Sequence, residues 1–455
     1  MKAALTETKL HPQIPPLEDF SFVGSPDTTL GVELELQIID PDSGDLVPGA
    51  LRILDACAEE NIEGVSGEFL LSMLEIKTAV CGNVAEVKDA LVRTFSQVRN
   101  IAYSLGYDLA IGGTHPFARP CTSAISPEDR YQRLRKEQGW LAYQEAIFGL
   151  HVHVGVPGAL EAIGVANLIV EYLPHLLALS ANSSFWEGVD TSFASVRARM
   201  FRPSAQSGIP PHFSNWEEFC RYCKLMHAGR ALASTKDLYW DVRPRPHLGT
   251  LEFRIFDAPA SLSTLLGLTA LARCLVIEGL RLLKEQPDQL AGDPSRYLLA
   301  NENKWLAARY GLQAPCVRRP GEECRTLAED TDQLLDRLEP VAREAGEATF
   351  LDAFQPLDQF ELGADRQRRL YRQTGNWHAV VADMRDRWLQ EIHETAPAGL
   401  ITRPNSSERN QSALHDRRPS VDGHLKRQEC DRAAVRTGPA TANWGQSTVP
   451  GHNLR

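Results

Sequence analysis

The chain has 455 residues, of which 43% are hydrophobic and 24% are charged, and its formal net charge at pH 7 is −11. This composition is typical of a globular protein with a full hydrophobic core, and the length allows one large domain or two to three average ones. The negative charge argues against general binding to nucleic acids or to anionic membranes.

The periodicity of apolar residues predicts one domain of strands and helices over residues 21–395, preceded by a proline-rich lead-in over 1–20. Alternating apolar and polar residues predict strands, in chain order, over 29–39, 108–112, 149–156 and 248–257. Apolar residues three and four apart predict helices, in chain order, over 50–61, 87–105, 159–185, 261–284, 327–341 and 366–393. The third helix is expected to be interrupted at Pro174, and the last to be divided around Gly375.

The composition changes near Ala396. From there to Arg455 the residues are mainly Ser, Asn, Pro, Gly, Arg and Asp, with nine Lys or Arg and five Asp or Glu, a net charge of +4. Such a segment buries too little apolar surface to offset the entropy that ordering costs. We therefore predict a disordered basic tail over 396–455.

Nine cysteines are scattered along the chain without the spacing of a disulfide framework, and we interpret them as reduced thiols of a cytoplasmic protein. Residues 1–13 contain no apolar run, so no secretory signal is expected. The apolar stretch 265–283 is interrupted by Arg273, Glu278 and Arg281, which predicts a buried helix and not a membrane span.

Glu33 and Glu35 lie two residues apart in GVELELQIID (31–40), on an otherwise apolar strand. Two carboxylates about 7 Å apart on one face of a partly buried strand repel each other unless a cation compensates their charge. The pair therefore indicates a cation site, or else an exposed edge strand whose glutamates face water. In a cation site, neutralising Glu33 is expected to raise the thermal stability of the metal-free protein.

Two more carboxylates, Glu68 and Glu75, lie seven residues apart in GEFLLSMLEIKT (67–78). This spacing places both on one face of a helix and on opposite faces of a continuous strand. A turn after Glu68 followed by a strand over 74–78 would also let the two side chains converge. Either carboxylate taken alone is more typical of an ordinary surface.

His151 and His153 share one face of the strand GLHVHVGV (149–156), so both could bind metal, or one could bind metal while the other donates a hydrogen bond. Two histidines in this pattern also occur in zinc hydrolase sites. Glu252 and Arg254 share a face of LGTLEFRIFD (248–257), where an ordinary ion pair is the alternative to a binding role. Together, four separate segments place charged or ligand-type side chains where a core strand is normally apolar.

The ligand types decide the class of metal. Several carboxylates with one or two histidines favour Mg²⁺ or Mn²⁺ over zinc, and Mg²⁺ held in this way usually works with substrate phosphates. Arginines that could contact phosphate are Arg197, Arg199, Arg243 and Arg254. Neither the P-loop nor the Rossmann glycine pattern occurs, so those two kinds of nucleotide site are not indicated.

Seven segments, in the order given and within residues 20–390, together resemble the glutamate–cysteine ligase type 2 (carboxylate–amine ligase) family, which is distantly similar to glutamine synthetase. They are GVELELQIID, EFLLSMLEIKTAVC, GGTHPF, GLHVHVGV, LALSANSSFWEGVDTSFASVRARMF, WDVRPRPHLGTLEFRIFDAP and ENKWLAARYGL. The chain departs from the family in its tail after Ala396 and at Lys304, where arginine is more usual.

The resemblance implies an α+β fold of the glutamine synthetase type, with a large, curved, mostly antiparallel sheet lined with carboxylates and backed by helices. It also implies bound Mg²⁺–ATP, with Arg254 in contact with a phosphate. From the residues themselves, Arg243 is a second candidate for contact with the nucleotide, and Arg197 and Arg199 are further catalytic candidates. The metal ligands implied are Glu33, Glu35, Glu68, Glu75, His153 and Glu252. A homodimer is the family's expectation.

We interpret the chain as an ATP-dependent ligase that joins a carboxylate to an amine through an acyl phosphate. L-glutamate and L-cysteine are the nominal substrates and γ-glutamylcysteine, ADP and phosphate the products. Two alternatives remain: a divalent-metal hydrolase that uses His151, His153 and the carboxylates, and a catalytically silent binding protein with the same fold. The sequence leaves the true amine open.

Overall fold

The computed structural model describes residues 20–120, 123–200, 206–286, 294–319 and 321–395. The chain divides into two compact units, Met1–Arg403 and Pro404–Arg455. The second unit, and with it the predicted tail over 396–455, lies outside the described residues, as does most of the predicted lead-in. All that follows concerns the first unit.

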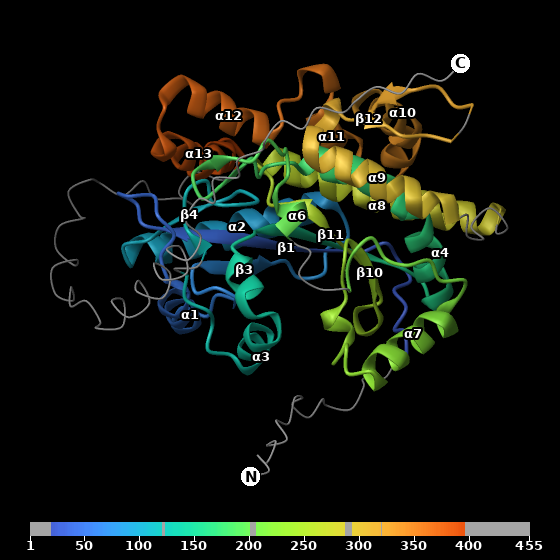
Figure 1. Cartoon of the computed structure of the whole chain (residues 1–455), viewed down its shortest axis with the longest axis horizontal. Helices are drawn as coiled ribbons and strands as arrows, with labels where there is room; N and C mark the ends of the chain where they lie inside the picture. The colour runs from blue at the N-terminus through green and yellow to red at the C-terminus, as the bar shows by residue number, and fades with distance from the viewer. Residues whose placement is uncertain (1–19, 121–122, 201–205, 287–293, 320, 396–455) are drawn as a thin grey trace, which may run out of the picture. The chain divides into compact units, whose positions relative to one another are not determined.

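The secondary structure elements alternate between strands and helices along the chain (Figure 1). The strands are β1 (Leu30–Ile39), β2 (Val65–Gly67), β3 (Met73–Lys77), β4 (Asp108–Ala110), β5 (Gly149–Gly155), β6 (Phe185–Trp186), β7 (Val189–Asp190), β8 (Ser207–Gly208), β9 (Tyr239–Trp240), β10 (Val242–Arg245), β11 (Thr250–Asp257), β12 (Pro315–Cys316) and β13 (Arg325–Thr326). The α-helices are α1 (Ala50–Glu59), α2 (Val84–Ser104), α3 (Asp129–Gln138), α4 (Ala159–Ile169), α5 (Leu173–Ser180), α6 (Arg197–Met200), α7 (Trp216–Ala228), α8 (Leu262–Glu285), α9 (Pro294–Tyr310), α10 (Leu327–Glu344), α11 (Ala348–Leu351), α12 (Gly363–Thr374) and α13 (Trp377–Thr395).

Seven of these strands form one sheet in the order β10–β11–β5–β1–β3–β2, with β4 paired to the far part of β1. Every strand pair in this sheet is antiparallel. The predicted α+β class with a large antiparallel sheet is therefore confirmed. The strand β10 is not predicted, because it contains Pro244 and proline is unusual inside a strand. A sheet tolerates proline in an edge strand, and β10 is the edge strand here.

The alternation in the sequence of β1 divides the two faces of the sheet. Leu30, Val32, Leu34 and Leu36 are buried in the main hydrophobic core, and the residues between them are less buried. The same core holds the apolar residues of β3, β5 and β11, so one face of the sheet is apolar and the other carries the charged side chains.

Helices cover the apolar face, and those that follow β11, from α8 to α13, gather on one side of the strands in Figure 1. The long helix α8 is buried along most of its length, including Leu265, Leu268 and Leu271. It starts where Ser261 accepts a hydrogen bond from the backbone N–H of Thr264, a standard N-cap. The predicted helix over 261–284 is thus confirmed within one residue.

The helix predicted over 159–185 is instead α4, a single 3₁₀ turn and α5, and it ends at Ser180. Pro174 stands in the first turn of α5, where its missing N–H leaves no hydrogen bond unmade. The combined segment Ala159–Ser180 is long and apolar enough to cross a membrane, but 78% of its apolar window is buried inside the protein. It is covered like the core helix of a globular protein.

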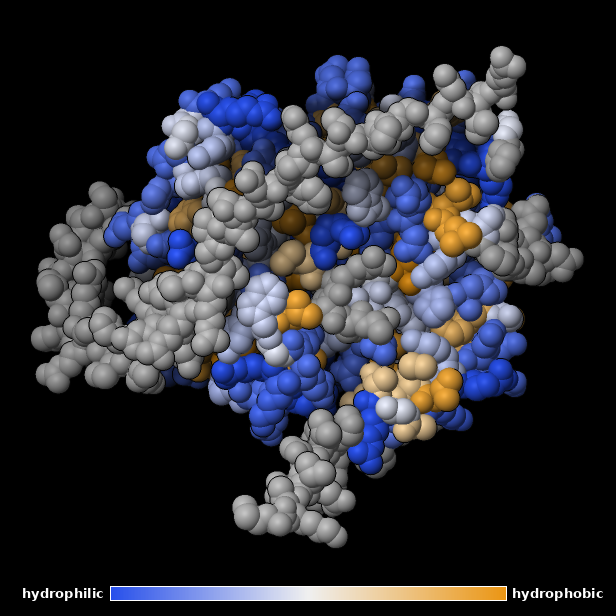
Figure 2. Space-filling view, in the orientation of Figure 1, coloured by the Kyte–Doolittle hydropathy of each residue, from blue (hydrophilic) through white to orange (hydrophobic). Residues whose placement is uncertain are grey.

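The last predicted helix is divided as expected, into α12 and α13. Gly375 lies between them with φ of +60°, a left-handed conformation that favours glycine and ends α12. On the face drawn in Figure 2, hydrophilic residues predominate among the coloured atoms and the hydrophobic residues form separate patches. Large exposed apolar side chains include Leu225 on α7 and Leu298 on α9.

Candidate active site on the charged face of the sheet

Strand register brings together the ligand-type residues that were predicted from separate segments. His151 on β5 lies opposite Glu33 on β1, and β11 places Glu252 opposite His153. Across the other edge of β1, Glu75 on β3 lies opposite Glu35. Because paired residues of an antiparallel sheet point to the same face, all these side chains share one surface.

Glu33 lies at the centre of this surface and is surrounded by nitrogen atoms. Its Oε2 is 3.2 Å from His151 Nδ1, and its Oε1 is 3.8 Å from both His153 Nε2 and Lys77 Nζ. Burial acts to raise the pKa of Glu33, but the hydrogen bond with His151 and the charge of Lys77 outweigh it and lower that pKa below its ordinary value. Glu33 is therefore ionised near neutral pH.

A second group, of three carboxylates, lies beside the first. Glu35, Glu68 and Glu75 each contribute one carboxylate oxygen, and these three oxygens lie within 4.8 Å of one another. Burial is the main cause that raises the pKa of Glu35 and of Glu68 to about 7, and that of Glu75 to about 8. Mutual repulsion adds to this rise, since Glu75 acts on Glu35 and Glu68 acts on Glu75.

Glu68 reaches this group through a turn. The sequence allows either this turn or a helix that would carry both Glu68 and Glu75. Glu68 lies after β2 and before the start of β3 at Met73, so the helix alternative is wrong. The phenol of Tyr131 on α3 donates a hydrogen bond of 3.1 Å to Glu68 Oε2. The chain reversal lets Glu68 and Glu75 converge from positions seven residues apart.

Glu252 is fully buried and is held by three arginines. Arg243 donates from Nε and from one terminal nitrogen to its two oxygens at 2.8 and 3.1 Å. Arg245 and Arg254 donate at 2.7 and 2.6 Å. Burial acts to raise the pKa of Glu252, but these guanidinium charges, that of Arg243 first, hold it well below its ordinary value.

The two arginines of β10, Arg243 and Arg245, differ in their hydrogen-bond partners. The remaining terminal nitrogen of Arg243 bonds to the backbone carbonyls of Lys236, at 3.0 Å, and Leu238. Its donors are thus directed to protein atoms, which suits a residue that positions Glu252. Arg245 was not singled out from the sequence, although it shares the face of Arg243 two residues away, and it lines the cavity described below.

A β-bulge in β11 sets the direction of Arg254. Phe253 pairs with Val152 and Phe256 with Leu150, so both Arg254 and Ile255 lie opposite His151. A terminal nitrogen of Arg254 is 3.4 Å from His151 Nδ1.

Arg197 is buried beneath the site. Its terminal nitrogens bond weakly to the backbone carbonyls of Arg254 and Ile255, at 3.4 and 3.5 Å. Gly149 makes room for it, because a Cβ there would lie 2.2 Å from the guanidinium, and the Gly149 N–H donates to Glu35 at 2.5 Å. Arg199, two residues further along α6, is not among the described residues that line the cavity.

These side chains surround a cavity of about 230 Å³. Its lining includes Glu33, Glu35, Glu68, Glu75, His151, Arg197, Arg243, Arg245, Glu252 and Arg254. It also includes polar residues that the sequence analysis did not select, namely Lys77, Arg130, Tyr131, Glu145, Lys236 and Tyr239. Of these, Lys77 had a local signal, because it shares the strand face of Glu75.

The donor set fits a divalent cation. Three combinations bring one ligand atom from each member within 4.8 Å of the others: Glu33, His153 and Glu252; Glu33, Glu75 and His151; and Glu35, Glu68 and Glu75. The Nε2 atoms of His151 and His153 are buried and form no hydrogen bond with the described residues. Carboxylates outnumber imidazoles, which favours a hard cation such as Mg²⁺ or Mn²⁺. A cation would also relieve the repulsion among Glu35, Glu68 and Glu75.

Solved structures show the fold. A bifunctional glutathione synthetase from Pasteurella multocida superposes with a TM-score of 0.61 and 16% sequence identity. The superposition covers 81% of this chain and 53% of that longer chain. A glutamate–cysteine ligase from Francisella tularensis, solved with AMP, matches 91% of this chain and 95% of its own (TM-score 0.59, 14% identity).

Sequence relatives are much closer. A protein of Rubrobacter xylanophilus named "Putative glutamate–cysteine ligase 2-3" is 38% identical over 361 residues, 79% of this chain and 97% of the relative. A protein of Gloeobacter violaceus named "Putative glutamate–cysteine ligase 2" is 38% identical over 371 residues, which are 80% of this chain and 97% of the relative. The family model of Glutamate-cysteine ligase family 2 (GCS2) matches residues 29–386, which include every predicted site residue. The chain therefore belongs to the glutamate–cysteine ligase 2 family.

Proposed function

We propose that this protein is a cytoplasmic ATP-dependent carboxylate–amine ligase that activates the γ-carboxylate of L-glutamate, with L-cysteine as the first candidate amine. One observation carries the proposal. A single sheet face holds a group of carboxylates and histidines that fits hard cations, directly beside the guanidiniums of Arg245 and Arg254. Cations and arginines side by side are what transfer of a phosphoryl group from ATP needs.

The chemistry follows from the poor reactivity of carboxylates. A glutamate γ-carboxylate oxygen attacks the γ-phosphorus of ATP, ADP leaves, and an acyl phosphate forms. The amine nitrogen then attacks the acyl carbon, phosphate leaves, and the nitrogen loses a proton. In this reaction Arg254 and Arg245 bind the transferring phosphoryl oxygens, while Glu252 and Arg243 fix the direction of those guanidiniums.

Glu33, Glu35, Glu68, Glu75 and His153 are proposed to hold Mg²⁺ or Mn²⁺, with His151 as a further candidate. When bound, the cations would neutralise charge on the phosphate oxygens of the nucleotide. Glu252 is a weaker candidate ligand than the others, because its two oxygens already accept hydrogen bonds from three arginines.

The experiment that tests the proposal measures phosphate release with Mg–ATP and L-glutamate, screened against a panel of amines that includes L-cysteine and hydroxylamine. Phosphate and ADP in equal amounts, released only with an amine, and a γ-glutamyl product of the expected mass support the ligase. Hydroxylamine traps an acyl phosphate as the hydroxamate, so a hydroxamate supports the intermediate. No ATP turnover with any amine would contradict the proposal.

The same preparation distinguishes the metal hydrolase alternative. The feature that favours a hydrolase is the pair of buried imidazoles of His151 and His153, whose Nε2 atoms form no hydrogen bond with the described residues. A hydrolase is expected to contain zinc after purification and to act without ATP, whereas the ligase is expected to do neither. Metal analysis and an ATP-free assay therefore separate the two functions.

A further inference from the structure

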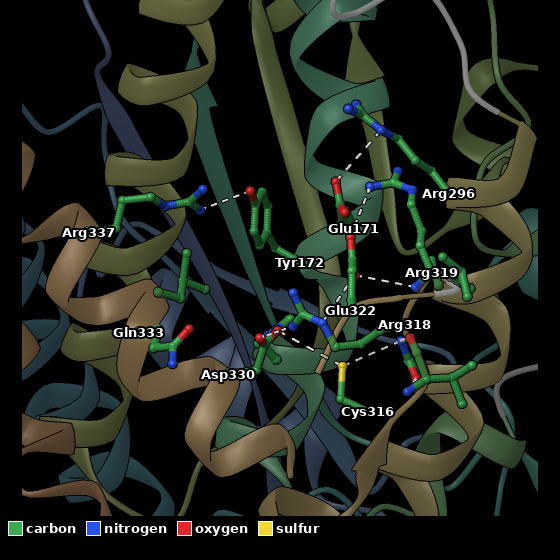
Figure 3. Close-up of a pocket in the computed structure, with 16 residues that line it drawn as sticks. Glu171, Tyr172, Arg296, Cys316, Arg318, Arg319, Glu322, Asp330, Gln333 and Arg337 are labelled. Atoms are coloured by element: carbon green, nitrogen blue, oxygen red, sulfur yellow. Dashed lines mark hydrogen bonds and ion pairs between the residues drawn. The ribbon is translucent and has the colours of Figure 1, made fainter. Parts of the chain in front are cut away.

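A second cavity, of about 310 Å³, lies among the helices and shares no lining residue with the cavity on the sheet (Figure 3). Its walls come from the 3₁₀ turn that precedes α5, from α5 itself, from α9 and α10, and from residues 316–319 with Glu322. Nothing in the proposed ligase reaction uses these residues.

The cavity is lined by more arginines than carboxylates. Four arginines, Arg296, Arg318, Arg319 and Arg337, face three carboxylates, which leaves a net of one positive charge. The whole chain carries a net charge of −11, so a positively charged pocket is a local departure from the general charge of the protein. Such a departure favours an anionic ligand.

Two of the carboxylates already have close cationic partners. Asp330 accepts a hydrogen bond of 2.9 Å from His175 Nε2 and another from Arg318. Glu322 accepts from Arg318 Nε at 3.2 Å and lies 3.9 Å from Arg319. These pairs compensate one another, and they hold the segment 316–319 against α10.

Arg337 and Arg296 are engaged differently. Within the described residues Arg337 forms no ion pair; it donates to the Tyr172 hydroxyl at 2.8 Å and lies 5.1 Å from the centre of that ring. Arg296 Nε is buried 3.8 Å from Glu171 Oε2 and forms no hydrogen bond with the part of the chain that the structure describes. Figure 3 shows the two side chains entering from opposite sides, with Glu171 and Tyr172 between them.

We propose that this cavity binds a small ligand through a phosphate group. Each of these two guanidiniums can offer a phosphate the two parallel N–H donors of its planar fork. The volume exceeds what one phosphate ion fills and lies at the small end of ligand sites, so a phosphate monoester of a small metabolite fits better. The Tyr172 ring supplies an apolar surface for the remainder of that ligand. This site is independent of the proposed ligase reaction.

The test titrates the full chain with inorganic phosphate and, separately, with glycerol 3-phosphate by isothermal calorimetry at low salt. The variant is Arg296→Gln/Arg337→Gln. Arg343→Gln is the matched control, since Arg343 is an exposed arginine of α10 whose one ion pair among the described residues is with Glu339 on its own helix. Arg254→Gln, which removes the guanidinium charge at the sheet, serves as the control for phosphate bound there.

The expected result is one equivalent of binding that persists in Arg343→Gln and Arg254→Gln and weakens at least about tenfold in the double variant. Tighter binding of the ester than of inorganic phosphate would identify the ester as the ligand class, and equal binding would identify the phosphate ion. Absence of binding to the unsubstituted protein overturns the proposal. So does a double variant with unchanged stoichiometry and affinity, or loss of all binding in Arg254→Gln.

Discussion

Arg254 is the side chain in which a structural role and a catalytic role are hardest to separate. It pairs with Glu252 at 2.6 Å, and it also lines the cavity beside His151. Glu252 keeps two other arginine partners, so its charge stays compensated when Arg254 changes. A substitution at Arg254 therefore tests function with limited risk to folding.

Arg254→Lys keeps the charge but loses the planar fork of donors. We expect it to fold normally, to bind Mg–ATP, and to lose at least about a hundredfold in kcat, because an arginine on a transferring phosphoryl group contributes roughly 10³–10⁵ in other enzymes. Circular dichroism, nucleotide binding and steady-state kinetics check the three parts. A kcat near that of the unsubstituted enzyme would remove Arg254 from phosphoryl transfer.

Glu75 and Glu33 are expected to respond in opposite ways to loss of their charge. Burial and the neighbouring carboxylates raise the pKa of Glu75 to about 8, so ionising it destabilises the metal-free fold as the pH rises from about 4.5 to 8. Glu75→Gln should therefore raise the Tm of the EDTA-treated protein by a few degrees at pH 8.5, with no gain at pH 5. Thermal scans at the two pH values measure this difference, and Glu344→Gln, at an exposed position, is the control.

For Glu33 the structure changes the expectation drawn from the sequence. The pKa of Glu33 is lowered, so its ionised form stabilises the fold above about pH 4.5, and that stabilisation is lost as the pH falls through the lowered value. Glu33→Gln should lower the Tm of the metal-free protein at pH 7 and also abolish ligation. An increase in Tm would show that repulsion from Glu35 and Glu75 outweighs the contacts with His151 and Lys77.

At the scale of elements, α9 is linked to the site strands through one buried ion pair. Lys304 Nζ is 2.5 Å from Asp241 Oδ2, and the Asp241 carbonyl accepts the backbone N–H of Arg254 at 2.7 Å. The pair therefore fixes the backbone of β11 just where its bulge directs Arg254.

Lys304→Met should destabilise the protein by about 3–5 kcal/mol, because it leaves the carboxylate of Asp241 buried without that cation. Lys304→Arg should retain most of the stability and activity. Urea unfolding of both variants measures the difference. Equal stability of Lys304→Met and the unsubstituted protein would show that the pair has no structural role.

Across the whole molecule, the proposed metal site couples stability to pH and to cations. Glu35, Glu68 and Glu75 all have raised pKa values of about 7 to 8, so without metal the fold should lose stability as the pH rises from 5 to 8. Bound Mg²⁺ or Mn²⁺ should restore it, and binding should release protons near pH 7.

Thermal scans with EDTA and with Mg²⁺ at pH 5.5 and 8 measure this coupling, and calorimetry in buffers of different ionisation enthalpy counts the protons released. We expect a larger gain in Tm from Mg²⁺ at pH 8 than at pH 5.5, and loss of ligation in EDTA without unfolding. An equal gain at both pH values would exclude these carboxylates as ligands.

The sequence by itself determined which residues share a strand face. Glu33 with Glu35, and His151 with His153, could be predicted because period-two alternation is a local property of the backbone. The divided helix at Gly375 and the start of α8 at Ser261 were predictable for the same reason, since turns and caps involve neighbours in the chain. The resemblance of several motifs to one family added the fold.

Only the tertiary structure decided which strands are neighbours, and with it the partners of each charge. The order β11–β5–β1–β3 joins segments more than two hundred residues apart, and nothing local records that register. It also decided that Glu68 follows a turn, that a bulge directs Arg254, and that Arg243, Arg245 and Arg254 all hold Glu252. The pKa of Glu33 is lowered and that of Glu75 is raised. Both shifts depend on burial and on neighbouring charges from other strands, and the sequence does not show which strands are neighbours.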